Sequence, residues 1–149
     1  MNNSDAANQY VVFKLREEYY GIPISYVKTL EKVTDITRVP NAEEYVIGVM
    51  NLRGEVVPII DLRLRFGFEA NEKSEDARTI VLTLDDLVIG LSVDSSSEVL
   101  TIEDEDIDSA AKFINSFEDD YIKGIGKVDG RMIILIDIHK LVNNKLEAN

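Results

Sequence analysis

An internal repeat constrains the fold of this chain more than any other feature of its sequence. The segment YVIGVMNLRGEVVPIIDL, from residue 45, aligns without a gap on YIKGIGKVDGRMIILIDI, from residue 121, at an offset of 76 residues. A weaker match aligns residues 10–21 with 79–90 at an offset of 69. Identical residues in the stronger match pair Tyr45 with Tyr121, Gly48 with Gly124, Gly54 with Gly130, Ile60 with Ile136 and Asp61 with Asp137. A period near seventy residues is too long for a solenoid and is typical of a duplicated small β-barrel.

Apolar and polar residues alternate along most of the chain, which indicates β-strands. In TIVLTL, for example, Ile80, Leu82 and Leu84 share one face, so we expect at least two of them to be buried, with Ile80 as the exception if one is exposed. Two-residue turns between such segments predict four hairpins, and the strongest turn signal is Asp129-Gly130. The other three turns are expected at Glu17-Glu18, Arg53-Gly54 and Asp85-Asp86.

Helical spacing is convincing only at the C-terminal end. There an apolar stripe follows Asp137, which is a suitable N-cap, and Asp61 occupies the matched position in the first repeat. We therefore predict helix N-caps at both aspartates and a C-terminal helix that docks on the sheets. The residues of the stripe are Ile138, Leu141, Val142 and Leu146.

The order of these segments is hairpin, connector, hairpin, twice over. We therefore predict an all-β fold with short helices, in which repeat units at about 10–68 and 79–142 each close a barrel of about five strands. Residues 1–9 are expected to form a flexible N-terminus. The charged segments 69–78 and 103–120 are expected to be linkers.

Composition excludes several classes of function. The chain has no cysteine, which rules out disulfides and thiolate metal sites and favours a reducing, cytoplasmic location. Its formal net charge of −12 opposes binding to nucleic acid or anionic lipid, because no basic patch interrupts it. The first residues resemble no signal peptide, and no apolar run reaches membrane-spanning length, so we expect neither export nor direct membrane insertion.

Candidate catalytic and metal-binding residues are few, and each has a simpler explanation. The single histidine, His139, lies off the apolar stripe and is predicted to be a solvated helix residue. The run EDEDID, residues 103–108, resembles the start of an EF-hand loop, but Ser109 and Asn115 stand where a glycine and a glutamate are needed. Asp85-Asp86 is explained by turn formation, and no phosphate-binding glycine motif is present. We predict no catalytic residue, metal or cofactor, and a binding role.

A structural role in the turn does not explain why residue 53 is an arginine. Arg53 lies in the turn Asn51-Leu52-Arg53-Gly54, where Gly54 suits a positive φ and Asn51 suits a bulge, but the turn does not require an arginine. Arg53 is either a surface charge in a salt bridge or an interface anchor. The residues predicted to have structural roles at turns and caps are Gly48, Asn51, Gly54, Asp61, Gly130 and Asp137.

The string GVMNLRGEVVPIIDLRLRFG, residues 48–67, resembles the characteristic segment of the CheW-type chemotaxis coupling proteins. The segments YYGIPISYVKTLEKV, ITRVP, GLSVDSSSEVLTI and YIKGIG with GRMIILIDI resemble the family in the same order, from about residue 10 to 146. The resemblance implies two SH3-like five-stranded barrels. It also implies a non-catalytic adaptor that joins chemoreceptor tips to the regulatory domain of the histidine kinase CheA, in the cytoplasm at membrane-associated receptor clusters.

In this family a helical hairpin at the receptor tip docks in an apolar groove between the barrels. The positions that correspond to this receptor-binding site are Arg53, Val27, Val56 and Ile80. The family often has an acidic residue where Thr29 stands here, and the second repeat has Asp129 at the position of Arg53. The resemblance assigns no residue to the kinase-binding surface.

Other functions remain as alternatives. A stand-alone scaffold for another sensory histidine kinase pathway would have the same features. A small β-barrel enzyme or ligand-binding protein would need a cleft of titratable groups, which the sequence does not indicate. A fused receiver domain, as in the related CheV adaptors, would not fit in 149 residues beside two barrels.

Overall fold

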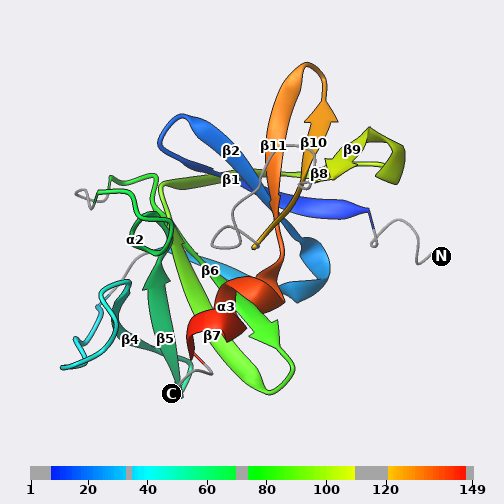
Figure 1. Ribbon diagram of the computed structural model, residues 1–149. Coiled ribbons are helices and arrows are strands. Elements are labelled where there is room, and N and C mark those ends of the chain that lie inside the picture. Colours follow the sequence, from blue (N-terminus) through cyan, green and yellow to red (C-terminus); the bar gives the residue numbers. More distant parts are fainter. Residues whose placement is uncertain (1–7, 33–34, 70–73, 110–120, 147–149) are drawn as a thin grey trace. The chain divides into compact units, whose positions relative to one another are not determined.

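The computed structural model describes residues 8–32, 35–69, 74–109 and 121–146 (Figure 1). Strands dominate and the helices are short, as predicted. The first six strands are β1 (Gln9–Leu15), β2 (Glu18–Pro23), β3 (Val27–Lys32), β4 (Val46–Leu52), β5 (Glu55–Asp61) and β6 (Arg78–Leu84). They are followed by β7 (Leu87–Val93), β8 (Ser95–Thr101), β9 (Ile107–Ser109), β10 (Ile122–Val128) and β11 (Arg131–Ile136). The α-helices are α2 (Leu62–Arg65) and α3 (Ile138–Leu146), and short 3-10 helices cover Ile24–Tyr26 and Asp104–Asp106.

The strands form two sheets, and the chain divides into two compact units. Unit 1 comprises residues 1–13, 17–25 and 97–149, and unit 2 comprises residues 14–16 and 26–96. The first sheet has six strands in the order β8-β1-β2-β11-β10-β9. The second sheet has five strands in the order β3-β6-β7-β5-β4.

The two repeats exchange hairpins between these sheets. In the first sheet, β2 of the first repeat lies parallel to β11 of the second, with Gly21 opposite Leu135. In the second sheet, β5 of the first repeat lies parallel to β7 of the second, with Ile59 opposite Gly90. In Figure 1, blue β1 and β2 therefore belong with orange β10 and β11. The expectation that each repeat supplies the strands of its own barrel is wrong, because equivalent hairpins offer equivalent edges and can pair across repeats.

The repeat itself is reproduced in detail. The β4–β5 hairpin has a register shift between Val46 and Gly48, and β10–β11 has the same shift between Ile122 and Gly124, 76 residues later. In both hairpins the same aspartate position donates its backbone N–H to the matching tyrosine carbonyl at 2.7 Å. The two segments are thus copies of one structure, as the alignment predicted.

The hairpin turns agree with three of the four predictions. The turns at Arg53-Gly54, Asp85-Asp86 and Asp129-Gly130 lie between the strands as expected. The first turn is Arg16-Glu17 instead of Glu17-Glu18, because β2 already begins at Glu18. The predicted linker 103–120 also contains β9, which pairs with β10 and forms the edge of the first sheet. Residues 110–120 of that segment lie outside the described residues.

Each unit has its own apolar core. Residues of the core in unit 1 include Tyr10, Val12, Ile102, Ile133 and Leu135. In unit 2 the corresponding cluster is Met50, Val57, Ile59 and Val81. Among the described residues, no helix is long and apolar enough to cross a membrane.

Candidate protein-docking site

Arg53 lies at the tip of the β4–β5 hairpin with its side chain 74% exposed. Its φ is +50°, in the left-handed region, where a residue with a Cβ costs about 1 kcal/mol relative to glycine. Asp129, at the matched tip of unit 1, has φ +52° and is a residue type that such turns accept readily. The backbone conformation at residue 53 therefore does not favour an arginine, which agrees with the prediction that the turn does not require one.

Two ion pairs join this hairpin tip to strand β3. The Arg53 guanidinium Nη1 lies 3.4 Å from Oε2 of Glu31, and Nζ of Lys28 lies 3.3 Å from Oε1 of Glu55. Thr29, which stands where the family often has an acid, donates its hydroxyl to the same Oε2 of Glu31 at 2.9 Å. We call this cluster the tip junction; its residues are Lys28, Thr29, Glu31, Arg53 and Glu55. It connects the hairpin to β3, an edge strand of the five-stranded sheet.

The strand register places the three predicted aliphatic site residues on one face of the second sheet. Val27 is opposite Leu82 on β6, two residues from Ile80. Ile80 is opposite Leu91, and Leu91 is opposite Ile60 on β5. Because every second residue of a strand faces the same way, Val56 shares this face with Ile60. We call this the outer face of unit 2, since Val81 of the core cluster faces the other way. Its central residues Ile60, Ile80 and Leu91 are buried, whereas Val56 is exposed.

The exposure of these residues differs sharply. Val56 is 67% exposed, Val27 is partly buried, and Ile80 is fully buried together with Leu82 and Leu84. The expectation that at least two of these three are buried is confirmed, and Ile80 is no exception, because β6 lies between β3 and β7 in the sheet. Leu30, opposite Ile80 and 45% exposed, also belongs to the outer face. Sequence analysis missed Leu30, because the register shift between Val27 and Thr29 puts positions 27 and 30 on the same face.

Unit 1 has a matching apolar surface. Met132 stands at the position of Val56 and is 69% exposed. Beside it is a hollow of about 360 Å³, and Lys127 forms an ion pair with Asp108 at 3.1 Å on its border. The residues that line the hollow are Glu18, Asp108, Ile125, Lys127, Met132 and Ile134. Ile125 and Ile134 match Val49 and Pro58 of unit 2, so the hollow lies on the equivalent face of the sheet.

The residues predicted to be structural take the expected roles, with one difference. The Asn51 side-chain oxygen accepts a hydrogen bond from the Gly54 N–H at 2.8 Å, which stabilises the turn. The bulge expected at Asn51 lies instead at Gly48, where a Cβ would collide with the backbone oxygen of Thr37. Gly54 and Gly130 both adopt positive φ at the hairpin tips. Asp137 accepts a hydrogen bond from the Lys140 N–H at 3.2 Å, as an N-cap does.

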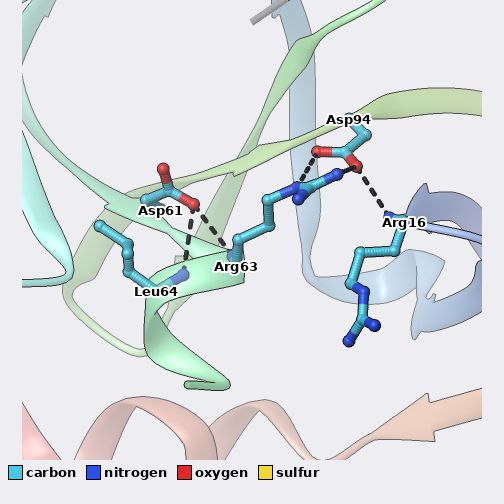
Figure 2. Close-up of polar contacts among 5 residues, drawn as sticks. All are labelled: Arg16, Asp61, Arg63, Leu64 and Asp94. Atoms are coloured by element: carbon cyan, nitrogen blue, oxygen red, sulfur yellow. Dashed lines mark hydrogen bonds and ion pairs between the residues drawn. The ribbon is translucent and has the colours of Figure 1, made fainter. Parts of the chain in front are cut away.

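Asp61 belongs to a buried polar network that sequence analysis identified only in part (Figure 2). Its side chain caps α2 by accepting hydrogen bonds from the N–H groups of Arg63 and Leu64. The Arg63 guanidinium donates to both oxygens of Asp94, with Nη2 at 2.6 Å from Oδ2, and Arg16 donates its N–H to the same carboxylate at 2.8 Å. The hydrogen bonds to Asp94 raise the pKa of Arg63, although burial acts in the opposite direction. No local pattern marks Asp94 as the partner, since it follows Arg63 by 31 residues.

The remaining candidates for chemistry do not assemble into a site. Among the residues that the structure places, no three His, Asp or Glu side chains are grouped so that they could hold a metal ion. His139 is partly buried on α3, and the acidic run of residues 103–108 forms a 3-10 helix and the start of β9. Exposed apolar side chains are instead present in both units, at Val56 and Leu30 in unit 2 and at Met132 in unit 1, and Arg53 stands at the tip of the hairpin that carries Val56.

Comparison with known proteins identifies the family. The model of the CheW-like domain matches residues 9–146. The chain belongs to the CheW-like family. A chemotaxis protein CheW from Klebsiella aerogenes is 37% identical over 137 residues, which cover 92% of this chain and 82% of the relative. A chemotaxis protein CheW from Thermotoga maritima is 30% identical over 93% of this chain and 91% of the relative.

A solved CheW structure supports the fold directly. The scaffolding protein TtCheW from Thermoanaerobacter tengcongensis superposes with a TM-score of 0.83, at 37% identity, over 91% of this chain and 92% of that one. The two-sheet, strand-rich architecture is thus that of CheW. Scaffolding proteins are a non-catalytic class, which agrees with the prediction that this CheW-like chain is not an enzyme.

Proposed function

We propose that this CheW-like protein is a cytoplasmic adaptor that couples chemoreceptor tips to the regulatory domain of the histidine kinase CheA, at receptor clusters near the membrane. Family membership supports a role in chemotaxis signalling, and the paired apolar faces support a protein with two partners. The observation that carries the proposal is the outer face of unit 2, where exposed Val56 and Leu30 lie on the same face as Val27. An apolar strand face bordered by one cation suits the apolar stripe of a helix.

The receptor-binding surface is proposed to comprise Arg53, Val27, Val56 and Leu30. Ile80 remains in the site as a support for Leu30, which lies opposite it on β3, and not as a contact, because it has no exposed surface. Arg53 provides a planar donor group at the border, which fixes the orientation of a partner that the apolar contacts alone would leave free to slide.

The kinase-binding surface is proposed to be the matching face of unit 1. Met132 is the most exposed large apolar residue described, and it borders the hollow with Ile125 and Ile134. A flexible methionine beside aliphatic residues is typical of protein contact surfaces. This assignment gives each partner one of two equivalent faces.

Matched substitutions in the two units test the proposal. Val56→Glu and Met132→Glu place a charge at the same position of each sheet. Calorimetric titration with a receptor-tip fragment and with the kinase regulatory domain should show that Val56→Glu weakens only receptor binding and Met132→Glu only kinase binding. If both variants bind both partners as the wild type does, the protein is a scaffold for a different kinase pathway or uses other surfaces.

Arg53→Ala is the second test, with Asp129→Ala as its control at the equivalent turn. Arg53→Ala should leave stability within about 0.5 kcal/mol of the wild type, as exposed substitutions usually do. Asp129→Ala should cost about 1 kcal/mol of stability, because alanine tolerates the positive φ of this position less well than aspartate. Arg53→Ala should weaken receptor binding by about 1 to 2 kcal/mol, and Asp129→Ala should not. An Arg53 variant that binds the receptor fragment as well as the Asp129 variant would remove Arg53 from the site.

A further inference from the structure

A hollow in unit 2 lies outside both proposed partner surfaces. It has a volume of about 280 Å³ and is placed at the C-terminal end of helix α2. Its lining residues are Arg16, Arg63, Gly67, Phe68 and Glu69. Two of the five are arginines, although the chain as a whole has a net charge of −12. Guanidinium groups that line a hollow are typical of a site for an anionic group.

The turn that follows α2 fixes the position of the Phe68 ring in this hollow. Gly67 adopts φ +85°, and its N–H donates to the carbonyl oxygen of Leu64 at 3.0 Å. The Phe68 N–H donates to the carbonyl oxygen of Arg63 at 2.7 Å, which completes a Schellman motif. The Phe68 ring packs edge-on against Phe66, with 6.1 Å between the ring centroids. The ring is therefore held both by the backbone and by a second aromatic side chain.

The Arg16 guanidinium lies over the Phe68 ring, and its hydrogen-bond donors are available. Its Cζ is 4.5 Å from the centroid of the ring. The backbone N–H of Arg16 donates to Asp94, but the side chain runs away from that carboxylate (Figure 2). Among the described residues, no acid lies within ion-pair distance of this guanidinium. A guanidinium stacked on a ring uses its face, so its N–H groups still point outward in the plane.

Asp94 does not compete for the Arg16 side chain, because its own oxygens are occupied. Oδ1 and Oδ2 accept from Nε of Arg63 at 2.9 and 3.0 Å, and Oδ2 also accepts from Nη2 at 2.6 Å. The charges of Arg63 and Asp94 therefore cancel, and Arg16 is the cation that a ligand meets. Glu69 adds one negative charge to the lining of the hollow, which disfavours a ligand with more than one negative charge.

We propose that this hollow binds a carboxylate group. The planar edge of a guanidinium matches the two oxygens of a carboxylate, and both hydrogen bonds can form while Arg16 stays on the Phe68 ring. The ligand is either a small carboxylic acid or an acidic side chain of another protein, since both present the same group to Arg16. The site is independent of the coupling role and of the apolar faces proposed for it.

NMR titration of the full-length protein with sodium acetate tests the site, with the Arg16 Nε–H resonance as the readout. This resonance should shift and saturate in the millimolar range, which suits a ligand of so few atoms. Acetamide, the uncharged counterpart of acetate, should produce no saturable shift. The exposed Arg38 is the internal control, and its Nε–H resonance should shift only linearly with acetate.

Two substitutions test the parts of the site, and the amide dispersion of each variant reports that it is folded. Phe68→Leu removes the ring but no charge, and should weaken acetate binding about fivefold or more, because the Arg16 guanidinium is no longer oriented. Glu69→Gln removes the repelling charge, and should tighten acetate binding about twofold to fivefold. Sulfate, which is a dianion, should bind the wild type more weakly than acetate does.

A further probe distinguishes the two sources of the carboxylate. N-acetyl-glutamic acid amide carries the acidic side chain of a protein. If it binds more tightly than acetate, the ligand is a protein side chain, and equal or weaker binding indicates a small carboxylic acid. The proposal is wrong if the Arg16 resonance shifts as linearly as that of Arg38, if sulfate binds as well as acetate, or if Phe68→Leu leaves the affinity unchanged.

Discussion

The buried hydroxyl group of Tyr45 lowers the stability of the folded protein. The residue is 8% exposed, and its hydroxyl is buried with no hydrogen-bond partner among the described residues. Burial also raises the pKa of this phenol. A buried hydroxyl without a partner loses its bonds to water and gains nothing in exchange.

Tyr45→Phe should therefore be neutral or stabilising, by up to about 1 kcal/mol. The ring stays in place, including its contact with the Arg65 guanidinium, which lies 5.6 Å from the ring centroid. Chemical denaturation of the variant beside the wild type would measure the change. A loss above about 1 kcal/mol would mean that the hydroxyl has a partner in solution.

The ion pair between Glu98 and Arg131 makes the stability of the folded protein depend on pH. Arg131 donates hydrogen bonds to both carboxylate oxygens, at 2.8 and 3.3 Å. These bonds lower the pKa of Glu98 below its ordinary value of 4.5, although burial acts in the opposite direction. A carboxyl group whose pKa is lower in the folded state stabilises the protein above the unfolded pKa, and this contribution is lost as the pH falls through the folded value.

The stability difference between the wild type and Glu98→Gln should therefore be present at pH 7 and shrink below about pH 4.5, the ordinary carboxyl value. Urea denaturation at several pH values would follow it. A difference that stays constant down to pH 3 would show that the carboxylate charge is not what Arg131 recognises.

At the scale of elements, strand β6 carries apolar residues on both faces. Val81 belongs to the core of unit 2, and Ile80 and Leu82 on the opposite face are also fully buried. Periodicity alone assigned only one of these faces to the core. A strand between two others in a sheet has no edge in solvent, and of the seven residues of β6 only Thr83 is exposed.

Ile80→Ala and Leu82→Ala should each destabilise the protein by about 2 to 5 kcal/mol, the usual range for truncation of a buried aliphatic side chain. Unfolding midpoints of the two variants would measure this. A small loss for Ile80→Ala beside a large one for Leu82→Ala would show that Ile80 is loosely packed and available to a partner after all.

For the whole molecule, the pairing of hairpins between repeats predicts that neither half of the chain folds alone. Residues 1–69 contain β1 to β5, and residues 74–149 contain β6 to β11, so each half lacks strands from both sheets. Neither half can complete a sheet alone. The parallel pairings of β2 with β11 and of β5 with β7 form only when both halves are present.

Separate fragments cut between residues 69 and 74 should therefore be unfolded, and an equimolar mixture should regain the folded spectrum. Amide dispersion in NMR spectra of each fragment, of the mixture and of the intact protein would show this. If the two fragments fold independently, the pairing of hairpins between repeats is wrong, and each repeat forms its own sheet.

The sequence by itself determined the local structure and the family. Alternation predicted the strands, turn residues predicted three of four hairpin turns, and the matched Asp61 and Asp137 predicted two helix caps, because each depends on neighbouring residues. The 76-residue repeat predicted even the equivalence of the hairpins. The tip residue Arg53 could be singled out because its turn does not need it.

Tertiary structure alone decided which hairpins pair, that Ile80 on β6 is buried and which acid contacts Arg53. Equivalent hairpins present equivalent edges, so a repeat in the sequence cannot specify whether pairing occurs within or between repeats. The burial of Ile80 depends on residues far away in the chain. The pairs Arg53 with Glu31 and Arg63 with Asp94 join side chains 22 and 31 residues apart, and only the folded backbone brings such charges within reach of each other.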